Sequence, residues 1–182
     1  MADLRTADQL LELAKNELGN MLMDSSTAAG DLSILVPAGS IREVLTKLRD
    51  ADGLRFDLMS YMTVVDYHPQ EPRFELVYDM YSVDTANRIR VRCRLADTGS
   101  EKDLPEIDSV ADIFMASNWH EREAYDLYGI NFKGHPDQRR ILLPENWDGH
   151  PLRRDYPYDG KPVWKLGASV AEPEAKFDIL EN

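Results

Sequence analysis

The sequence predicts an α+β fold: N-terminal helices packed on a mainly antiparallel sheet, followed by a helix and an extended C-terminal segment. Apolar residues recur at helical spacing in two early segments, polar and apolar residues alternate from Leu54 onward, and both periods are lost after Gly129. With 182 residues, 43% of them hydrophobic, the chain is long enough to bury a core. We therefore expect an α+β domain over residues 1–129 and an extended, partner-wrapping segment over residues 130–182.

Two helices are predicted near the N-terminus. Thr6 and Gln9 form a capping-box pattern at the start of residues 7–18, where leucines recur at helical spacing. Ser40 and Glu43 repeat this pattern before a second helical stretch with one apolar face. We therefore expect a side-chain cap at the start of each helix.

Four segments are predicted to be strands. "LSILVP" (32–37) is typical of a short buried strand, and "LRFDLMSYMTVVDYH" (54–68) of one long strand or a bent pair. Residues 73–83 and 88–96 predict a hairpin across the four residues 84–87. The sheet is therefore expected to be mainly antiparallel.

The hairpin register separates two faces. Pairing Tyr78 with Cys93 and Asp79 with Arg92 places the apolar side chains together and makes Cys93 a small core residue. The other face carries a row of arginines, Arg88, Arg90, Arg92 and Arg94. This row is either an anion or partner site or a solvated sheet face with cross-strand ion pairs, and the acidic residues within reach favour the second interpretation.

A charged helix follows the sheet. Ser109 is a candidate cap for "VADIF", and Asn118 for a helix from about Trp119 to Tyr128, which Gly129 ends. Charges occupy more of this helix than one solvated face requires. The helix is therefore either a surface element, or its carboxylates and arginine are buried in a network with the residues that follow.

No catalytic or metal-binding pattern is complete. His120 and Glu123 have the i,i+3 spacing of a metal pair, but no second such motif is present, and Ala124 stands where a zinc-protease helix has its second histidine. The chain has no Gly-x-Ser-x-Gly elbow and no glycine-rich phosphate loop. The single cysteine cannot form an internal disulfide or supply an iron–sulfur cluster by itself.

Charge and hydropathy exclude two further classes. A net charge of -12 at pH 7 argues against nucleic-acid binding, which requires a basic surface. No stretch approaches the roughly 18 apolar residues of a membrane span, and the acidic start does not resemble a signal peptide, so we expect a cytoplasmic location.

Two Gly-His-Pro motifs mark the C-terminal segment, in "GHPDQRR" (134–140) and "GHPLRRDYP" (149–157). Residues before proline favour extended geometry, so each motif is interpreted as a bend in an extended chain. Each arginine pair is interpreted as a clamp onto carboxylates of the adjoining helix or of a neighbouring subunit.

The stretch "EREAYDLYGINFKGHPDQRRIL" (121–142) resembles the signature of the C-type subunit of NADH-quinone oxidoreductase, the thirty-kilodalton subunit family of respiratory complex I. "LLPENWDGHPLRRDYP" (142–157) is similar to the continuation of this family. The resemblance implies a cofactor-free structural subunit in the hydrophilic arm, on the cytoplasmic side of the inner membrane, which touches the membrane only through the complex.

The resemblance also implies the partners: the D-type subunit, which shapes the quinone cavity, and the cluster-bearing subunits of the arm. The complex implies FMN, iron–sulfur clusters, NADH and quinone, none of them on this chain. The residues expected to dock partners or to form a structural network are Glu121, Arg122, Glu123, Asp126, His135, Arg139, Arg140, His150, Arg153, Arg154 and Asp155.

Three alternatives stay open at this point. The chain is also compatible with the equivalent subunit of a ferredoxin-, F420- or hydrogenase-linked membrane complex. A free-standing metal-dependent hydrolase built on His120 and Glu123, and an anion-binding module built on the arginines, are the other two.

Overall fold

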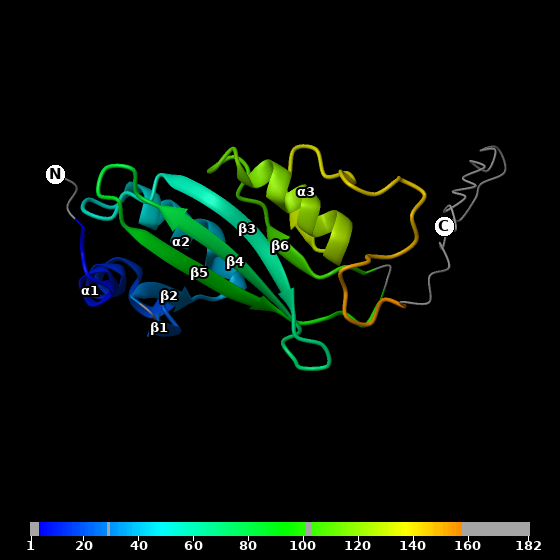
Figure 1. Ribbon diagram of the computed structural model, residues 1–182, viewed down its shortest axis with the longest axis horizontal. Helices are drawn as coiled ribbons and strands as arrows, with labels where there is room; N and C mark the ends of the chain where they lie inside the picture. Colours follow the sequence, from blue (N-terminus) through cyan, green and yellow to red (C-terminus); the bar gives the residue numbers. More distant parts are fainter. Residues whose placement is uncertain (1–3, 29, 101–102, 158–182) are drawn as a thin grey trace, which may run out of the picture.

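The computed structural model describes residues 4–28, 30–100 and 103–157, which form an α+β fold as predicted (Figure 1). The helices are α1 (Ala7–Leu18), α2 (Ile41–Asp50) and α3 (Ser117–Tyr128), with short 3₁₀ turns η1 (Gly19–Met21) and η2 (Ala38–Ser40). The strands are β1 (Asp24–Ala28), β2 (Asp31–Leu35), β3 (Leu58–Asp66), β4 (Phe74–Tyr81), β5 (Arg88–Leu95), β6 (Glu106–Asp108) and β7 (Asn131–Lys133).

The main sheet has five strands in the order β1-β2-β5-β4-β3. Strand β2 runs parallel to β5, and the other neighbours are antiparallel. The sequence did not predict β1, because its residues, "DSSTA", are small and polar and lie at the exposed edge of the sheet. Strands β6 and β7, also not predicted, form a separate two-stranded parallel sheet.

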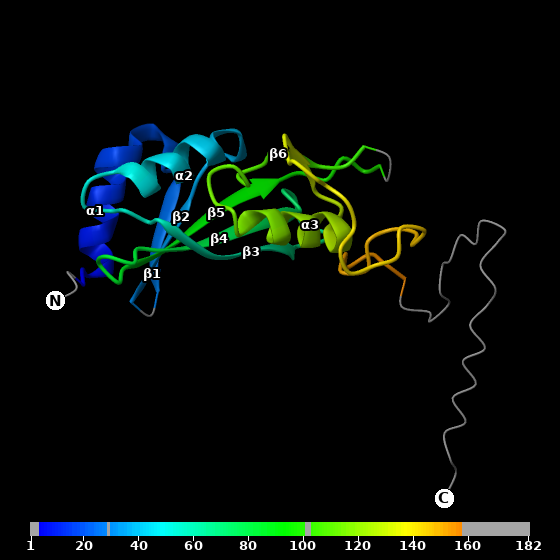
Figure 2. The same ribbon diagram turned by 90° about the horizontal axis from the view of Figure 1, so that it is seen from above.

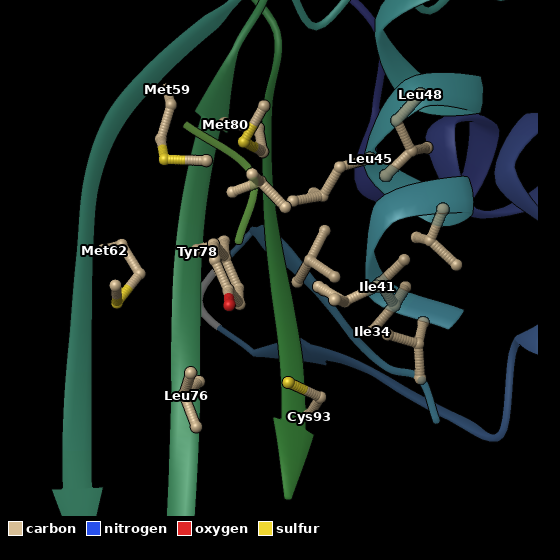
Figure 3. Close-up of a cluster of buried hydrophobic side chains, with 14 of the residues drawn as sticks. Ile34, Ile41, Leu45, Leu48, Met59, Met62, Leu76, Tyr78, Met80 and Cys93 are labelled. Atoms are coloured by element: carbon tan, nitrogen blue, oxygen red, sulfur yellow. The ribbon is translucent and has the colours of Figure 1, made fainter. Parts of the chain in front are cut away.

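One face of the main sheet carries the core. Figure 3 shows Ile41, Leu45 and Leu48 of α2 pointing toward the strands, where Tyr78 and Cys93 face them. All five side chains are fully buried, which confirms the predicted core position of Cys93. Figure 2 shows α1 and α2 along the same side of the sheet, so the helices cover one face.

The predicted N-terminal helix caps agree with the structure at only one position. Thr6 and Gln9 form the expected capping box. Ser40 does not cap α2, because it belongs to the 3₁₀ turn that runs into this helix and its backbone is not extended (φ -107°, ψ 5°). Asn118 does not cap α3 either, since that helix begins at Ser117, two residues before the predicted start at Trp119, and Asn118 lies inside it.

The predicted hairpin register is wrong by two residues. Tyr78 lies opposite Val91, not Cys93, and Asp79 lies opposite Arg90, not Arg92. The turn occupies 83–86, because the Ser82 N–H donates to the Asn87 carbonyl (2.9 Å) and closes the loop one residue earlier than expected. A shift of two residues leaves every side chain on its predicted face, so the division into an apolar and an arginine face holds.

Strand β3 departs from strict alternation. A bulge between Met59 and Tyr61 shifts its register against β4. Met59 and Met62 are therefore both buried, although strict alternation would place them on opposite faces. The bulge reconciles the sequence pattern with one long strand.

The chain after β7 follows an irregular course of turns and bends to Pro157. Figure 1 shows this stretch, 134–157, passing along α3 and returning toward the lower ends of the main-sheet strands. We call it the C-terminal segment. The part of the predicted extended segment beyond Pro157 lies outside the described residues.

Candidate partner interface and the networks that hold it

The charged helix α3 turns a polar face inward. Of its three carboxylates, Glu121 and Asp126 are fully buried, while Glu123 is exposed. A buried carboxylate is costly unless hydrogen bonds replace its water. Each of the two buried acids therefore organises a network of its own.

Glu121 fastens the loop before α3. Its oxygens accept hydrogen bonds from the Ser109 hydroxyl (2.5 Å), the Val110 N–H (2.8 Å) and the Ser117 hydroxyl. The Ser109 oxygen in turn accepts from the Ala111 N–H (3.2 Å). Ser109 was expected to cap "VADIF"; the structure forms a turn there instead of a helix, and Glu121 is the acceptor that orders it.

His135, in the first Gly-His-Pro motif, lies against α3. Its Nδ1 accepts from the Asp137 N–H (3.0 Å), so the proton of the neutral ring is on Nε2, which donates to the Asn118 carbonyl (3.2 Å). Nε2 is also 4.0 Å from a Glu121 oxygen, and both side chains are fully buried. The histidine thus closes a bend and joins it to the first turn of α3.

Asp126 organises the second network. One of its oxygens accepts three consecutive backbone N–H groups, those of Ile141 (3.0 Å), Leu142 (2.8 Å) and Leu143 (2.9 Å). The other accepts from Arg140 Nη1 (2.7 Å). Burial alone raises the pKa of Asp126, but these hydrogen bonds outweigh it and lower the pKa below its usual value.

Arg140 and Arg122 also donate hydrogen bonds to main-chain carbonyls. Arg140 Nη2 donates to the carbonyls of Trp147 and Gly149, both at 3.1 Å, and so ties two turns of the segment to Asp126. Arg122 donates to the carbonyls of residues 139 and 140, each at 3.2 Å. These two arginines brace the segment against α3.

The C-terminus of α3 is covered by the second Gly-His-Pro motif. Arg153 donates to the carbonyls of Tyr128 (2.7 Å) and Gly129 (3.3 Å), and His150 Nδ1 donates to the Asp126 carbonyl (2.9 Å). A cation at this end also complements the helix dipole. Burial, together with the nearby arginine cations, lowers the pKa of His150.

Gly129 makes this close approach possible. Its φ is +68°, the left-handed conformation typical of a helix-ending glycine, as the sequence predicted. A Cβ at this position would lie 2.5 Å from the His150 ring and 2.9 Å from Arg153 Nη2. Only glycine fits the packed turn.

A third network joins the end of the segment to the main sheet. Arg73, only 2% exposed at the start of β4, makes paired hydrogen bonds to Asp66 (2.9 and 2.8 Å) and to Asp155 (2.9 and 2.6 Å), and one to Asp97 (2.7 Å). Asp66 also accepts the backbone N–H of Arg154 (2.8 Å). One guanidinium therefore links three carboxylates that are far apart in sequence.

This network perturbs the acids it contains. Burial by itself raises the pKa of Asp66, but hydrogen bonds from Arg73 and from two backbone N–H groups lower it to about 2. The Arg73 guanidinium also lowers the pKa of Asp155. Both acids are ionised in the folded protein near neutral pH, so the buried guanidinium is surrounded by negative charge.

Three predicted site residues do not enter a buried network through their side chains. Glu123 and the Arg154 side chain are exposed, and Arg139 makes only a local exposed pair with Asp137 (3.0 Å). Apolar side chains also point outward here: Leu142 is 62% and Leu152 50% exposed, and Trp119 on α3 is 62% exposed. Polar groups of the segment therefore face inward while several apolar ones face solvent.

Arg73, Asp66 and Asp97 are site residues that the sequence analysis missed. They lie in or beside strands of the sheet, where a charged residue is normally assumed to face solvent. The usable signal is "HPQEPRFELVY" (68–78), which places an arginine directly before a run that is buried on both faces. An arginine that is buried at the start of such a strand requires acidic partners.

The positions of His120 and Glu123 do not support the alternative of a metal-dependent hydrolase. His120 is half-buried and Glu123 exposed, and they line a hollow of about 40 Å³ between α3 and β3. Within residues 4–28, 30–100 and 103–157, no group of three or more His, Cys, Asp or Glu side chains is arranged to hold a metal ion.

No helix in the part of the chain that the structure describes is long and apolar enough to cross a membrane.

The fold and these networks define a small α+β domain that fastens an irregular C-terminal segment through buried ion pairs. Residues 34–162 match the family described as "Respiratory-chain NADH dehydrogenase, 30 Kd subunit". The chain belongs to this family. The sequence resemblance is thereby confirmed.

Similar proteins carry consistent names. The second C-type subunit of NADH-quinone oxidoreductase from Rhizobium etli is 42% identical over 78% of this chain and 73% of its own length. The C-type subunit of NADH-quinone oxidoreductase from Citrifermentans bemidjiense is 41% identical over 80% of this chain and 86% of its own.

Two solved structures share the fold. A chain of the membrane-bound sulfane sulfur reductase, an archaeal respiratory membrane complex, superposes with a TM-score of 0.70 at 24% identity, over 83% of this chain and 85% of that one. A trypsin-resistant fragment of Nqo5 superposes with a TM-score of 0.55 at 26% identity, over 71% of this chain and 97% of that one.

Proposed function

We propose that this chain is a structural subunit, without a cofactor or active site of its own, of the hydrophilic arm of an NADH:quinone oxidoreductase. Its role is to dock the α+β domain on the quinone-cavity subunit through the C-terminal segment. NADH oxidation, electron transfer and quinone reduction belong to other subunits, which carry FMN and the iron–sulfur clusters. The complex sits at the cytoplasmic side of the inner membrane and supplies the only membrane contact.

The observation that carries this proposal is the arrangement of side chains in the C-terminal segment: polar ones face inward and several apolar ones face solvent. Its buried arginines and Asp155 bind α3 and Arg73, so the segment has a defined shape before any partner arrives. Leu142 and Leu152 project from that shape into solvent. A preordered segment that presents apolar side chains is suited to docking, because little conformational entropy is lost on binding.

The chain's single cysteine supports the division of labour. Iron–sulfur clusters are normally held by four cysteine ligands, and Cys93 is buried in the core of the sheet. Burial raises its pKa to about 12, so the thiolate that a metal requires does not form near neutral pH. Cys93 therefore acts as a small apolar core residue.

The alternative, an equivalent subunit of a complex with another electron donor, shares the fold with the archaeal reductase chain. At 24% identity that likeness concerns the fold alone. The two relatives named for NADH-quinone oxidoreductase are 42% and 41% identical, which favours the first assignment. Proteins that copurify with the chain distinguish the two, since only the first requires an NADH-oxidising module.

The test is to make Leu142→Glu and Leu152→Glu together in the full chain. Both side chains are exposed, so the substituted chain is expected to keep its melting temperature while losing copurification with the complex and NADH:quinone reductase activity in membranes. The matched control is Val83→Glu, 60% exposed in the hairpin turn, which leaves assembly intact. Normal assembly of the double variant would overturn the proposal.

A further inference from the structure

The outer face of the main sheet, opposite the helices, has a hollow of about 490 Å³. It runs across the strands from Ser26 of β1 to Thr63 of β3, with Val77 of β4 at its floor. Arg90 and Arg92 of β5 line it. The function proposed above makes no use of this hollow.

The arginine row on this face is mostly paired, as its second interpretation predicted. Arg88 and Arg90 approach Asp79 (3.2 and 3.4 Å), and Arg94 bonds Glu75 (2.8 Å). The two acids are almost completely buried beneath these arginines. Three of the four arginines therefore donate a hydrogen bond to a carboxylate.

Arg92 is different. Only 22% of its side chain is exposed, and its Nη1 lies 3.7 Å from Glu75 Oε1, which is an ion pair too long for a hydrogen bond. The other Glu75 oxygen, Oε2, bonds Arg94. No group within the described residues accepts a hydrogen bond from the Arg92 side chain, and its Nε is buried without a partner. Arg90 Nε and Ser33 Oγ, in the same hollow, are also buried without hydrogen-bond partners.

Buried donors without acceptors are costly, and a guanidinium presents five N–H groups. The hollow thus holds one weakly paired and partly exposed guanidinium, that of Arg92, to which an incoming carboxylate would bind. Val77, Val65 and Ala28 line the same hollow, so it also offers apolar surface. A carboxylate carried on a segment with apolar neighbours matches both features.

We propose that this hollow is a second interface, which binds a glutamate or aspartate side chain of an extended segment of another subunit, with Arg92 as its anchor. The inference rests on the proposed function only in that the chain sits in a complex. A phosphate or nucleic acid fits less well: its multiple charges would face the buried Glu75 and Asp79, and the net charge of -12 repels polyanions. Neutralising one cation requires a single carboxylate.

The experiment uses the assembled complex with a photoreactive amino acid in place of Thr63, which is exposed at the side of the hollow. Illumination is expected to crosslink it to a segment of another subunit that contains an aspartate or glutamate. Adding Arg92→Gln is expected to lower the crosslink yield about fivefold or more, because the charge is lost while size and donors are partly kept. Arg55→Gln, in an exposed pair with Asp84, is the matched control and leaves the yield unchanged.

A second label in place of Leu142 separates this inference from the proposed function. Crosslinks from Leu142 but none from Thr63 would overturn the second interface and leave the docking proposal standing. Crosslinks from Thr63 but none from Leu142 would overturn the docking proposal and leave the second interface standing. Crosslinks from neither position would overturn both proposals. A Thr63 crosslink confined to this chain, to lipid, or to a segment without acidic residues also contradicts the inference.

Discussion

The α+β domain and the C-terminal segment are stabilised by different kinds of interaction. The domain buries a continuous apolar core between α2 and the main sheet, with Ile34, Leu45 and Val91 fully inaccessible. The segment has neither helix nor strand from 134 to 157 and depends on ion pairs and hydrogen bonds to buried acids. Apolar contacts are non-directional and numerous, whereas each polar network centres on one side chain.

This difference predicts how each region tolerates change. Conservative replacement in a core typically costs about 1 kcal/mol, since neighbouring atoms remain in contact. Removal of one partner from a buried ion pair leaves an uncompensated charge and costs about 3–5 kcal/mol. The segment is therefore expected to be well ordered but sensitive to single substitutions and to pH.

The largest effect is expected for Arg73→Gln. Asp66, Asp97 and Asp155 would then face one another without the guanidinium, which costs about 3–5 kcal/mol of folding free energy. Urea unfolding followed by circular dichroism measures the loss. Ile34→Val, in the fully buried core, is the comparison and should cost only about 0.5–1.5 kcal/mol. Equal costs for the two variants would contradict the contrast between the regions.

A smaller effect is expected for Gly129→Ala. The new methyl group meets the His150 ring and Arg153 at the close distances given above, so it combines overpacking with a left-handed backbone and costs about 2–4 kcal/mol. Limited proteolysis should cut within 134–157 faster than in the unmodified chain. Gly134→Ala is the matched control: its φ is +80° but no atom lies within 4 Å of the added Cβ, so only about 1–2 kcal/mol of backbone strain is expected.

The smallest effect comes from acidification. The pKa of Asp66 is about 2 in the folded protein, below its unfolded value near 4, so its contribution of about 2 kcal/mol is complete above pH 4 and is lost as the pH falls through 2. The lowered pKa values of Asp126 and Asp155 act in the same direction. Amide signals of Ile141–Leu143 and Arg154 are expected to shift in this window by NMR, before those of core strand β5. If the amide signals of the segment and those of β5 changed at the same pH, the segment would have no separate sensitivity to acid.

Local patterns predicted the fold well. The helix over 7–18, the apolar face of α2 and the two faces of the hairpin follow from spacing within about ten residues. Strand β1 was not predicted because its residues are small and polar, and β6 and β7 were not predicted because three residues are too few to show an alternating pattern. The predicted caps at Ser40 and Asn118 were wrong because neither residue has the extended backbone of a cap: Ser40 ends a 3₁₀ turn and Asn118 lies inside α3.

The candidate site was predicted only in part. Asp126, Arg140 and Arg153 were recognised as charged residues near a helix, and the structure brings them to its C-terminal half. Their partners are mostly backbone groups, carbonyls for the arginines and N–H donors for Asp126, which no residue pattern identifies. Arg73 was missed because its partner Asp155 is 82 positions away in the sequence.

The sequence by itself determined the family, the order of the main helices and strands, and which side chains face the core, since these depend on short-range periodicity and a specific motif. Only the tertiary structure decided which carboxylate meets which arginine, that β2 runs parallel to β5, and that Arg92 pairs only loosely with Glu75. The physical reason is that ion pairing and strand neighbours depend on closing long loops. The geometry of that closure is set by the packing of the whole core and not by any local segment.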